Sequence, residues 1–319
     1  MSNPWCMNCF QYKGEYEVCP YCGYVENSLQ ETTCQLKPGT ILRKRYMIGK
    51  MKGIGGFGII YKGFDTALGI MVAVKEFYPA RLVRRMEGEE RVSVFSGERV
   101  GEFKRQLARF LNEAQNLTLF SKEPEIVQVY DYFEENGTAY IVMEYVNAPL
   151  LKEYLKIVGK IPAPEACAYM LSLLNAVEKI HEQGILHRDV SPDNIFLVDR
   201  GKVKLFDFGA AKFLKEQDGE EVPLVVKPGY APIEQYRSNW KQGFSMDLYA
   251  AGAVFYEMLT GRKPPESLDR LEQDDLRMPS EMGEDMDPVI EEAIRRAMNL
   301  NPEKRYRNAR EFKRAILKE

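Results

Sequence analysis

Residues 46–77 read YMIGKMKGIGGFGIIYKGFDTALGIMVAVKEF, and apolar and polar residues alternate on both sides of a glycine cluster. This period of two predicts strand, turn, strand, turn, strand. Gly53, Gly55 and Gly58 form a G-x-G-x-x-G motif, which brings backbone amides close to phosphates. Dinucleotide-binding folds use the same motif to open a helix, whereas here the glycines lead into the β-rich segment GIIYKGF. The stretch therefore predicts a phosphate-binding loop between two strands.

Five further motifs follow the glycine cluster in order along the chain. They are Val72-Ala73-Val74-Lys75, His187-Arg188-Asp189, Asn194, Asp207-Phe208-Gly209 and Ala231-Pro232-Ile233-Glu234. From about residue 41 onward, this order resembles that of the bacterial Ser/Thr protein kinases of the eukaryotic (Hanks) type. The resemblance implies a two-lobed α+β kinase fold, ATP and Mg2+ as cofactors, and transfer of the γ-phosphate to serine or threonine hydroxyls of protein substrates.

The resemblance assigns Lys75 to the α- and β-phosphates, and such a lysine needs a carboxylate that fixes its position. Glu113 in RFLNEAQNLTLF is the best candidate, because the apolar residues of this segment fall on one helical face. Glu102 and Glu123 are weaker alternatives. The 37 residues that separate Lys75 from Glu113 exceed the link expected in the family. Within them, RVSVFSGERV at 91–100 predicts an extra hairpin.

The resemblance also implies, by position, which residues contact the nucleotide. These are Gly53, Gly55, Gly56 and Gly58 at the phosphates, Ile60, Ala73 and Phe196 around the base, Met143 at the back of the pocket, and Glu144 to Val146 with backbone hydrogen bonds. Taken one at a time, the apolar members fit core positions equally well. Lys52 stands where the family usually has an aliphatic residue, and its methylene stem could still cover the base.

The segment HRDVSPDN at 187–194 corresponds to the catalytic loop in this resemblance. Phosphoryl transfer needs an aligned hydroxyl and neutralised charge more than covalent help from the protein. Asp189 is therefore expected to orient the substrate hydroxyl and to accept its proton. Asn194, five residues later, and Asp207 are the expected Mg2+ ligands.

Ser191 departs from the family, because a Ser/Thr kinase usually carries lysine there. Lys227 in VVKPGY is the candidate that replaces the missing charge, since it is the only cation close before PGYAPIE. Every other position that handles ATP and metal has its counterpart, whereas a pseudokinase usually shows a gap. An active kinase is therefore expected. The alternatives are a nucleotide-binding pseudokinase and an adaptor whose N-terminal zinc ribbon, described below, recruits a partner while the kinase fold acts as a scaffold.

Several further polar residues receive structural roles from the resemblance. His187 is expected to pack beside Phe208, Asp247 to brace the catalytic loop, and Glu234 to form a buried ion pair with Arg305. His181 is expected to be a residue at a helix end without a chemical role.

The segment between Asp207-Phe208-Gly209 and Ala231-Pro232-Ile233-Glu234 lacks a serine or threonine that could be phosphorylated to activate the kinase. Residues 207–234 contain no serine or threonine, and Tyr230 is the only hydroxyl. In many relatives a phosphorylated residue in this segment pairs with the arginine of the catalytic loop, here Arg188. Activation-loop phosphorylation is therefore not expected. An acidic cluster could pair with Arg188 instead or form a solvated loop; it consists of Glu216, Asp218, Glu220 and Glu221.

Four of the six cysteines stand in the order Cys6-x2-Cys9-x9-Cys19-x2-Cys22. Two such pairs complete a closed tetrahedral site of four thiolates, which suits structural zinc that takes no part in catalysis. Two disulfides or a rubredoxin-like iron site are the alternatives. Residues 1–34 resemble a short zinc ribbon, and their one basic residue against four glutamates opposes nucleic-acid binding. A protein partner or a purely structural role is expected for this ribbon.

The whole chain of 319 residues is 45% hydrophobic and 29% charged, with a net charge of −3. This composition is that of a globular protein and gives no electrostatic reason to expect nucleic acid. The start MSNPWCMNCF lacks the basic and apolar regions of a signal peptide, and a membrane span is not expected, so a cytoplasmic location is expected. The expected domains are the ribbon at 1–34, a linker at 35–45, an N-terminal lobe at 46–147 and a C-terminal lobe at 148–319.

Overall fold

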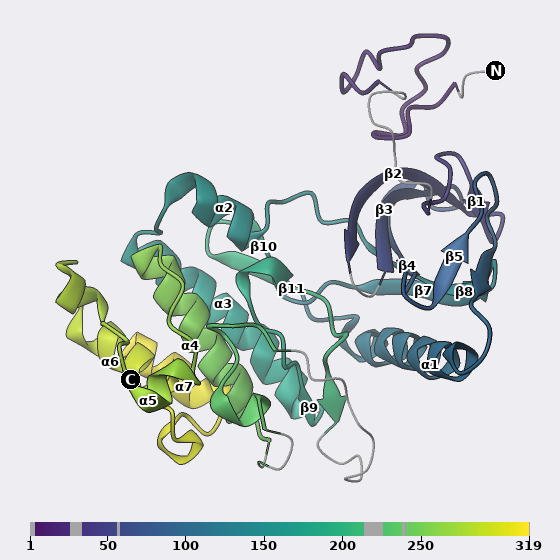
Figure 1. Cartoon of the computed structure of the whole chain (residues 1–319). Helices are drawn as coiled ribbons and strands as arrows, with labels where there is room; N and C mark the ends of the chain where they lie inside the picture. The colour runs from purple at the N-terminus through teal and green to yellow at the C-terminus, as the bar shows by residue number, and fades with distance from the viewer. Residues whose placement is uncertain are drawn as a thin grey trace. The chain divides into compact units, whose positions relative to one another are not determined.

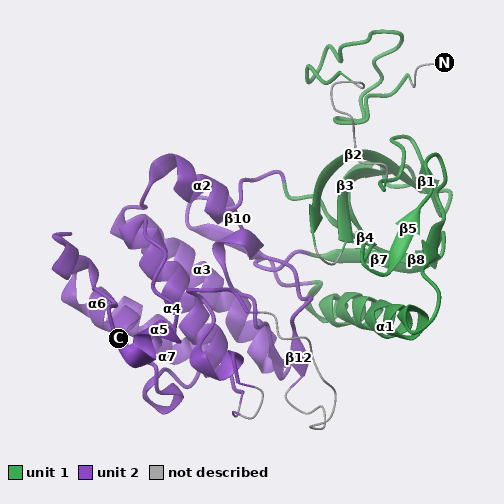
Figure 2. Ribbon diagram, in the orientation of Figure 1, with its two compact units in different colours: residues 1–121, 128–146 green, residues 122–127, 147–319 purple. Residues whose placement is uncertain are grey.

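The computed structural model describes residues 4–25, 34–55, 58–213, 226–237, 240 and 242–318. The chain divides into two compact units, drawn in different colours in Figure 2. Unit 1 comprises residues 1–121 and 128–146, and unit 2 comprises residues 122–127 and 147–319. The cysteine ribbon, described over residues 4–25, thus groups with the strands of unit 1.

Unit 1 is built on a six-stranded antiparallel sheet in the order β1-β2-β3-β4-β8-β7 (Figure 1). Alternation along these strands sends one set of side chains, including Tyr61, Val72 and Val74, into the fully buried core. The strands are β1 (Ile41–Leu42), β2 (Tyr46–Gly55), β3 (Gly58–Asp65), β4 (Ile70–Phe77), β7 (Val129–Glu135) and β8 (Thr138–Glu144).

Helix α1 (Arg99–Leu117) packs its apolar stripe against the sheet, and a short 3-10 turn, η1 (Thr118–Phe120), follows it. The rings of Phe103 and Phe110 lie 5.4 and 5.3 Å from that of Phe77 on β4. The apolar helical face predicted around Glu113 is therefore present, on a helix that begins at Arg99.

The predicted extra hairpin forms, but with other bounds. Strand β5 (Val83–Arg85) pairs with β6 (Val92–Val94), so the first strand lies before the segment expected to hold the whole hairpin. The end of that segment, at residues 99–100, instead begins α1. The earlier strand is fixed by a buried ion pair between Arg85 and Glu76, which no local pattern reveals.

Unit 2 is mainly helical. Its longest helices, α3 and α4, pack on each other, and α4 is buried along nearly its whole length. Among the described residues, no helix is both long and apolar enough to cross a membrane. The helices are α2 (Leu151–Val158), α3 (Ala163–Glu182), α4 (Ser245–Thr260), α5 (Asp269–Glu272), α6 (Pro288–Ala297) and α7 (Ala309–Leu317).

Short strands and turns connect these helices and carry the polar motifs. Strand β9 (Ile185–Leu186) pairs with β12 (Lys212–Phe213), and β10 (Ile195–Asp199) pairs with β11 (Lys202–Leu205). The expected pair of Glu234 and Arg305 lies buried, with Nη1 of the arginine 2.6 Å from Oε1 of the glutamate. The 3-10 turns are η2 (Pro192–Asn194), η3 (Ile233–Gln235), η4 (Pro279–Met282) and η5 (Pro302–Lys304).

Candidate active site

Within unit 1, Lys75 on β4 reaches the carboxylate of α1 that the sequence favoured. Its Nζ donates a hydrogen bond of 3.0 Å to Oε1 of Glu113. Both side chains are at most 10% exposed, so water screens this ion pair weakly. Of the two alternatives, Glu102 receives a hydrogen bond from Gln106 on the surface of α1, and Glu123 falls in unit 2.

The strand register places several predicted nucleotide contacts on the face that carries Lys75. Directly opposed residues of antiparallel strands share a face, as do residues two apart on one strand. Ile60 on β3 lies opposite Lys75. Ala73, two positions before Lys75 on β4, lies opposite Met143 on β8. On this face Ile60, Ala73 and Met143 are half-buried, whereas the opposite face carries the fully buried Tyr61, Val72, Val74 and Val142. Glu144, which opposes Val72, and Val146, beyond the end of β8, are half-buried as well but do not share the face of Lys75 through this register. This face can therefore present a partly accessible apolar surface.

The glycine hairpin, formed by the described ends of β2 and β3, has Gly55 opposite Gly58 and Gly53 opposite Ile60. A Cβ on Gly58 would lie 2.0 Å from the carbonyl oxygen of Glu76, so the neighbouring strand permits only glycine there. A Cβ on Gly53 or Gly55 would meet nothing within 4 Å. Backbone at these positions is thus accessible to a ligand. Gly56 lies outside the described residues.

In unit 2 the catalytic loop is held by Asp247 at the start of α4. One carboxylate oxygen accepts the amide of His187 at 2.9 Å, and the other accepts the amide of Arg188 at 2.8 Å. Arg188 has a left-handed backbone with φ of 65°, a strained conformation for a non-glycine residue that these bonds offset. The brace assigned to Asp247 from the resemblance thus corresponds to two hydrogen bonds.

His181 contributes more than a helix end. Its Nε2 lies 2.8 Å from Oδ2 of Asp247, and its ring stacks on Phe244. Burial acts to raise the pKa of Asp247, but hydrogen bonding and charge from His181, aided by His187, lower it below its ordinary value. The anionic brace therefore depends on a histidine that the sequence analysis treated as chemically idle.

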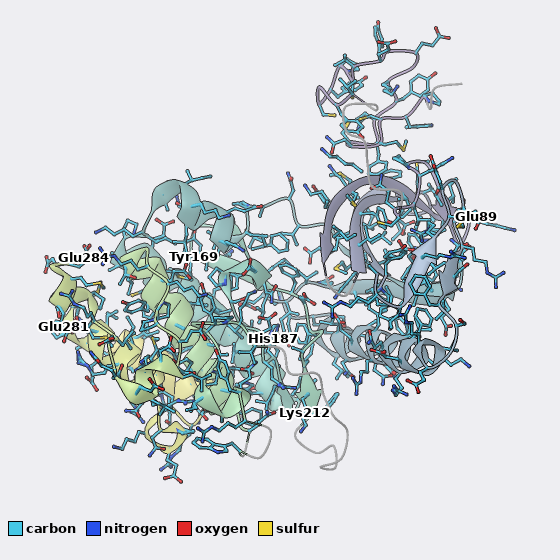
Figure 3. The ribbon with its side chains drawn as sticks, in the orientation of Figure 1. Glu89, Tyr169, His187, Lys212, Glu281 and Glu284 are labelled. Carbon is cyan, nitrogen blue, oxygen red and sulfur yellow. The ribbon has the colours of Figure 1, made fainter. Side chains whose placement is uncertain are left out.

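His187, labelled in Figure 3, is fully buried. Its ring meets that of Phe208 edge-on, with the ring centres 4.7 Å apart. Burial is the main cause that lowers the pKa of His187 below its ordinary value, against the opposing effect of the nearby carboxylates, Asp247 first. Its place beside Phe208 is the one that the resemblance implied.

Two oxygen-bearing side chains of unit 2, those of Asn194 and Asp207, fit a hard cation. The amide nitrogen of Asn194 donates to the carbonyl oxygen of Asp189 at 2.9 Å, which leaves the amide oxygen for a ligand. The amide of Phe206 donates to the carbonyl oxygen of Asn194 at 3.1 Å and brings Asp207 next to this turn. Carboxylate and amide oxygens are the donors that Mg2+ prefers. Asn194 and Asp207 therefore fit this metal, and Asp207, with φ of 64°, is held in a strained conformation.

Asp189 lies beside these residues in a partly desolvated position. Burial is the largest effect and raises its pKa, while Lys227 and then His187 act against that rise. A carboxylate in this setting can accept a proton more readily than one in water.

Lys227 reaches the catalytic loop at the position of the missing lysine. Its Nζ lies 2.8 Å from Oγ of Ser191 and 3.7 Å from Oδ1 of Asp189. It also lies 2.8 Å from Oδ2 of Asp193, a partner that the sequence analysis did not name. Lys152 bonds the other oxygen of Asp193, so one carboxylate tethers two cations next to the catalytic loop.

Arg188 is buried, and its Nε and Nη1 atoms have no hydrogen-bond partner among the described residues. It lines a small hollow with Asp189, Lys227, Tyr230 and Gln235. The acidic cluster proposed as its alternative partner lies outside the described residues. Phe196, predicted at the base, is half-buried in this unit and stacks on Phe206 at 4.7 Å.

A buried polar network beside Lys75 escaped the sequence analysis. Glu76, fully buried on β4, accepts hydrogen bonds from Arg85, from Tyr61 at 2.8 Å and from Tyr140 at 3.0 Å. Arg85 also donates to the carbonyl oxygens of Cys34 and Glu90. The network ties the extra hairpin and the chain before β1 to β4, the strand that carries Lys75. No residue spacing could have revealed it.

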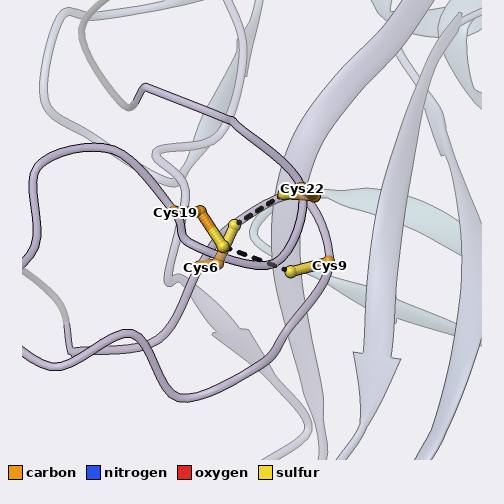
Figure 4. Close-up of side chains that lie close together, drawn as sticks. All are labelled: Cys6, Cys9, Cys19 and Cys22. Atoms are coloured by element: carbon orange, nitrogen blue, oxygen red, sulfur yellow. Dashed lines mark hydrogen bonds between the residues drawn. The ribbon is translucent and has the colours of Figure 1, made fainter.

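The four ribbon cysteines converge, as Figure 4 shows. All four Sγ atoms lie within 4.8 Å of one another, and the pairs Cys6–Cys22 and Cys9–Cys19 are each 3.6 Å apart. These separations are well above the length of about 2.05 Å of a disulfide bond, so the geometry does not match the disulfide alternative. Sulfurs of a tetrahedral zinc site lie about 3.8 Å apart, given Zn–S bonds of about 2.3 Å. The cluster therefore fits one metal ion.

Comparison with known proteins agrees with this geometry. Residues 46–315 match the family described as protein kinase domain, and the chain belongs to that family, whose members use ATP and Mg2+. It is 32% identical over 280 residues to a probable serine/threonine-protein kinase of Clostridium acetobutylicum, covering 86% of this chain and 40% of the relative.

Two relatives named PknB are also similar to the chain. A probable serine/threonine-protein kinase of Bifidobacterium longum is 35% identical over 241 residues, with 71% of this chain and 32% of the relative covered. The serine/threonine-protein kinase of Mycobacterium leprae is 30% identical over 290 residues, with 87% and 43% covered. The chain thus spans less than half the length of these curated relatives.

Proposed function

We propose that this chain is an ATP-dependent protein kinase that phosphorylates serine or threonine hydroxyls of proteins. The observation that carries the proposal is the closed, buried ion pair between Lys75 and Glu113. An isolated buried lysine would be costly, and its carboxylate partner leaves it charged and fixed for phosphate. The relatives are named serine/threonine-protein kinases, which supports the same reaction. That this chain acts on protein substrates is part of our proposal.

In the proposed reaction each polar residue has one task. Lys75 holds the α- and β-phosphates, and backbone amides of the glycine hairpin cover them. Asp189 orients the substrate hydroxyl and takes its proton at a carboxylate oxygen. Asn194 and Asp207 hold Mg2+, which when bound neutralises charge on the transferred phosphate.

Lys227 supplies the cation that Ser191 does not. Its position 2.8 Å from Oγ of Ser191 supports this role. The carboxylate of Asp193 holds the ammonium of Lys227 near Asp189. An ammonium has three N–H donors, so one remains for the transferred phosphate. Since the charge acts on the transferred phosphate, it should favour the transition state over the bound substrate.

Labelled ATP, Mg2+ and a generic protein substrate test the proposal directly. Wild-type protein should transfer label, and Asp207→Ala should not, whereas Asp199→Ala changes an exposed carboxylate on β10 and should leave transfer unchanged. If wild-type protein transferred no label, the proposed kinase activity would be refuted. A thermal shift with ATP and Mg2+ would then separate a pseudokinase, which gains stability from the nucleotide, from an adaptor, which does not.

We further propose that the ribbon holds one structural Zn2+ through Cys6, Cys9, Cys19 and Cys22. The closed set of four thiols leaves no position for substrate or water. A protein partner of the ribbon and a cytoplasmic location stay predictions from the sequence.

A further inference from the structure

The first knuckle of the ribbon packs directly on strand β2. The carbonyl oxygen of Met7 accepts the amide of Lys50 at 2.8 Å, and the Phe10 ring stacks on Phe64 of β3 at 5.4 Å. Met7 and Phe10 are 1% and 4% exposed, so this contact is dry. The ammonium of Lys50 also lies 5.5 Å from the ring centre of Tyr24 in the second half of the ribbon.

Gly49 shows that the two surfaces are fitted to each other. A Cβ at this position would lie 2.4 Å from the carbonyl oxygen of Met7 and 2.6 Å from the Phe10 ring. The backbone of Gly49 does not have a positive φ, so close approach rather than turn geometry calls for glycine. Any larger residue would push the ribbon away from β2.

The ribbon continues the cover on the outer edge of β2 toward the glycine hairpin. Ile48 bonds there with the chain before β1, through its amide to Thr40 and its carbonyl to Gly39. At the irregularity where the β2–β3 register shifts between Ile48 and Met51, the amide of Lys50 bonds to the carbonyl oxygen of Met7 instead of to β3. From Lys52 to Gly55, β2 is exposed. Met7 is thus the last edge partner that the described residues provide before Gly53.

The docking residues belong to the metal-binding knuckle itself. Met7 follows Cys6, and Phe10 follows Cys9 and donates its amide to the carbonyl oxygen of Cys6 at 2.8 Å. Phe10 has φ of 56°, which is strained for an aromatic residue and must be held by its surroundings. The cysteine cluster therefore fixes the geometry that the docking contact needs.

We propose that Met7 and Phe10 are positioning residues for ATP, because they clamp β2 three residues before the glycine hairpin and so hold the phosphate-binding backbone in place. This inference rests on the proposed function and deepens it. The ribbon, predicted from the sequence as a domain at residues 1–34, packs within the same compact unit as β2. The clamp acts on nucleotide affinity and contributes no group to phosphoryl transfer.

Two variants test the clamp from opposite sides. Phe10→Ala removes the ring stack, and Gly49→Ala adds the clashing Cβ. Tyr16→Ala, at an exposed ribbon tyrosine, and Gly101→Ala, on the outer face of α1, are the matched controls. Zinc content by elemental mass spectrometry and hydrogen exchange at the amide of Lys50 report on the ribbon without reference to activity.

Both test variants should keep zinc, lose protection of the Lys50 amide and raise the Kd and KM for ATP roughly threefold or more, with kcat nearly unchanged. Both controls should behave like wild type. Lost protection with an unchanged Kd, or protection retained in both variants, overturns the inference. Wild-type protein that binds ATP but transfers no phosphate would refute the proposed function instead, and the Kd comparison would still report on the clamp.

Discussion

Replacing Lys227 with methionine tests how the chain works without a lysine at position 191. Methionine keeps the apolar stem and removes only the charge. A unit charge about 4 Å from a developing charge contributes about 4 kcal/mol at an effective dielectric of about 20. The side chain is 30% exposed and shares its charge with Asp193, which reduces this value. We expect about a 100-fold loss of kcat, equivalent to about 2.7 kcal/mol, as for one lost oxyanion contact.

Steady-state kinetics with varied ATP should show the loss in kcat, while the Kd for ATP changes little. Lys202→Met, at an exposed lysine on β11, is the matched control and should retain the wild-type rate. Adding Ser191→Lys to Lys227→Met should return part of the lost rate, because the ammonium then starts from the catalytic loop. An unchanged kcat in Lys227→Met would refute the reasoning.

Three further predictions concern stability, metal and regulation. Arg85→Met should lower the free energy of unfolding of unit 1 by roughly 3 to 5 kcal/mol, read from hydrogen exchange at core amides of β4 and β8, because Glu76 loses its buried counter-charge. Cys6→Ser should reduce zinc from about one ion per chain and weaken ATP binding, measured by elemental mass spectrometry and nucleotide titration. Phosphatase-treated protein should start at its full rate without a lag, and mass spectrometry should place autophosphorylation outside residues 207–234, since Tyr230 is buried and donates to Glu257.

Each of these predictions has a control and a contrary outcome. Arg84→Met alters the exposed neighbour of Arg85 and should cost little; equal losses in both variants would contradict the buried ion pair. Cys34→Ser lies outside the cluster and should keep zinc, so zinc retained in Cys6→Ser would contradict the four-thiol site. A lag that disappears after preincubation with ATP would contradict constitutive activity.

Local patterns predicted the parts of unit 1 that depend on neighbours in sequence. Alternation around the glycines predicted β2, β3 and β4, and a helical period predicted α1, because both periods follow from backbone geometry. The motif order also led to Lys75 and Glu113. In the structure, Nζ of Lys75 lies 3.0 Å from Oε1 of Glu113. This pairing needed the family resemblance, since three glutamates were candidates from charge alone.

The remaining contacts join segments whose sequences show no sign of each other. Nothing in the sequence distinguishes Arg85 from its neighbour Arg84, and only the folded hairpin buries one against Glu76. Likewise, Gly49 reads as an ordinary strand interruption until Phe10 is packed on it. His181 gains its role through a carboxylate 66 residues away. Tertiary packing decides all three, and a local pattern carries no information about it.

The cover on β2 also bears on self-association. The family match begins at residue 46, the first residue of this strand. A chain shortened to that match would lose Gly39, Thr40 and Met7, and with them the partners of both backbone groups of Ile48 and of the Lys50 amide. An open row of such groups is a template for pairing with another chain. The residues before position 46 thus cover these backbone groups of β2 and should disfavour edge-to-edge pairing of the sheet with a second molecule.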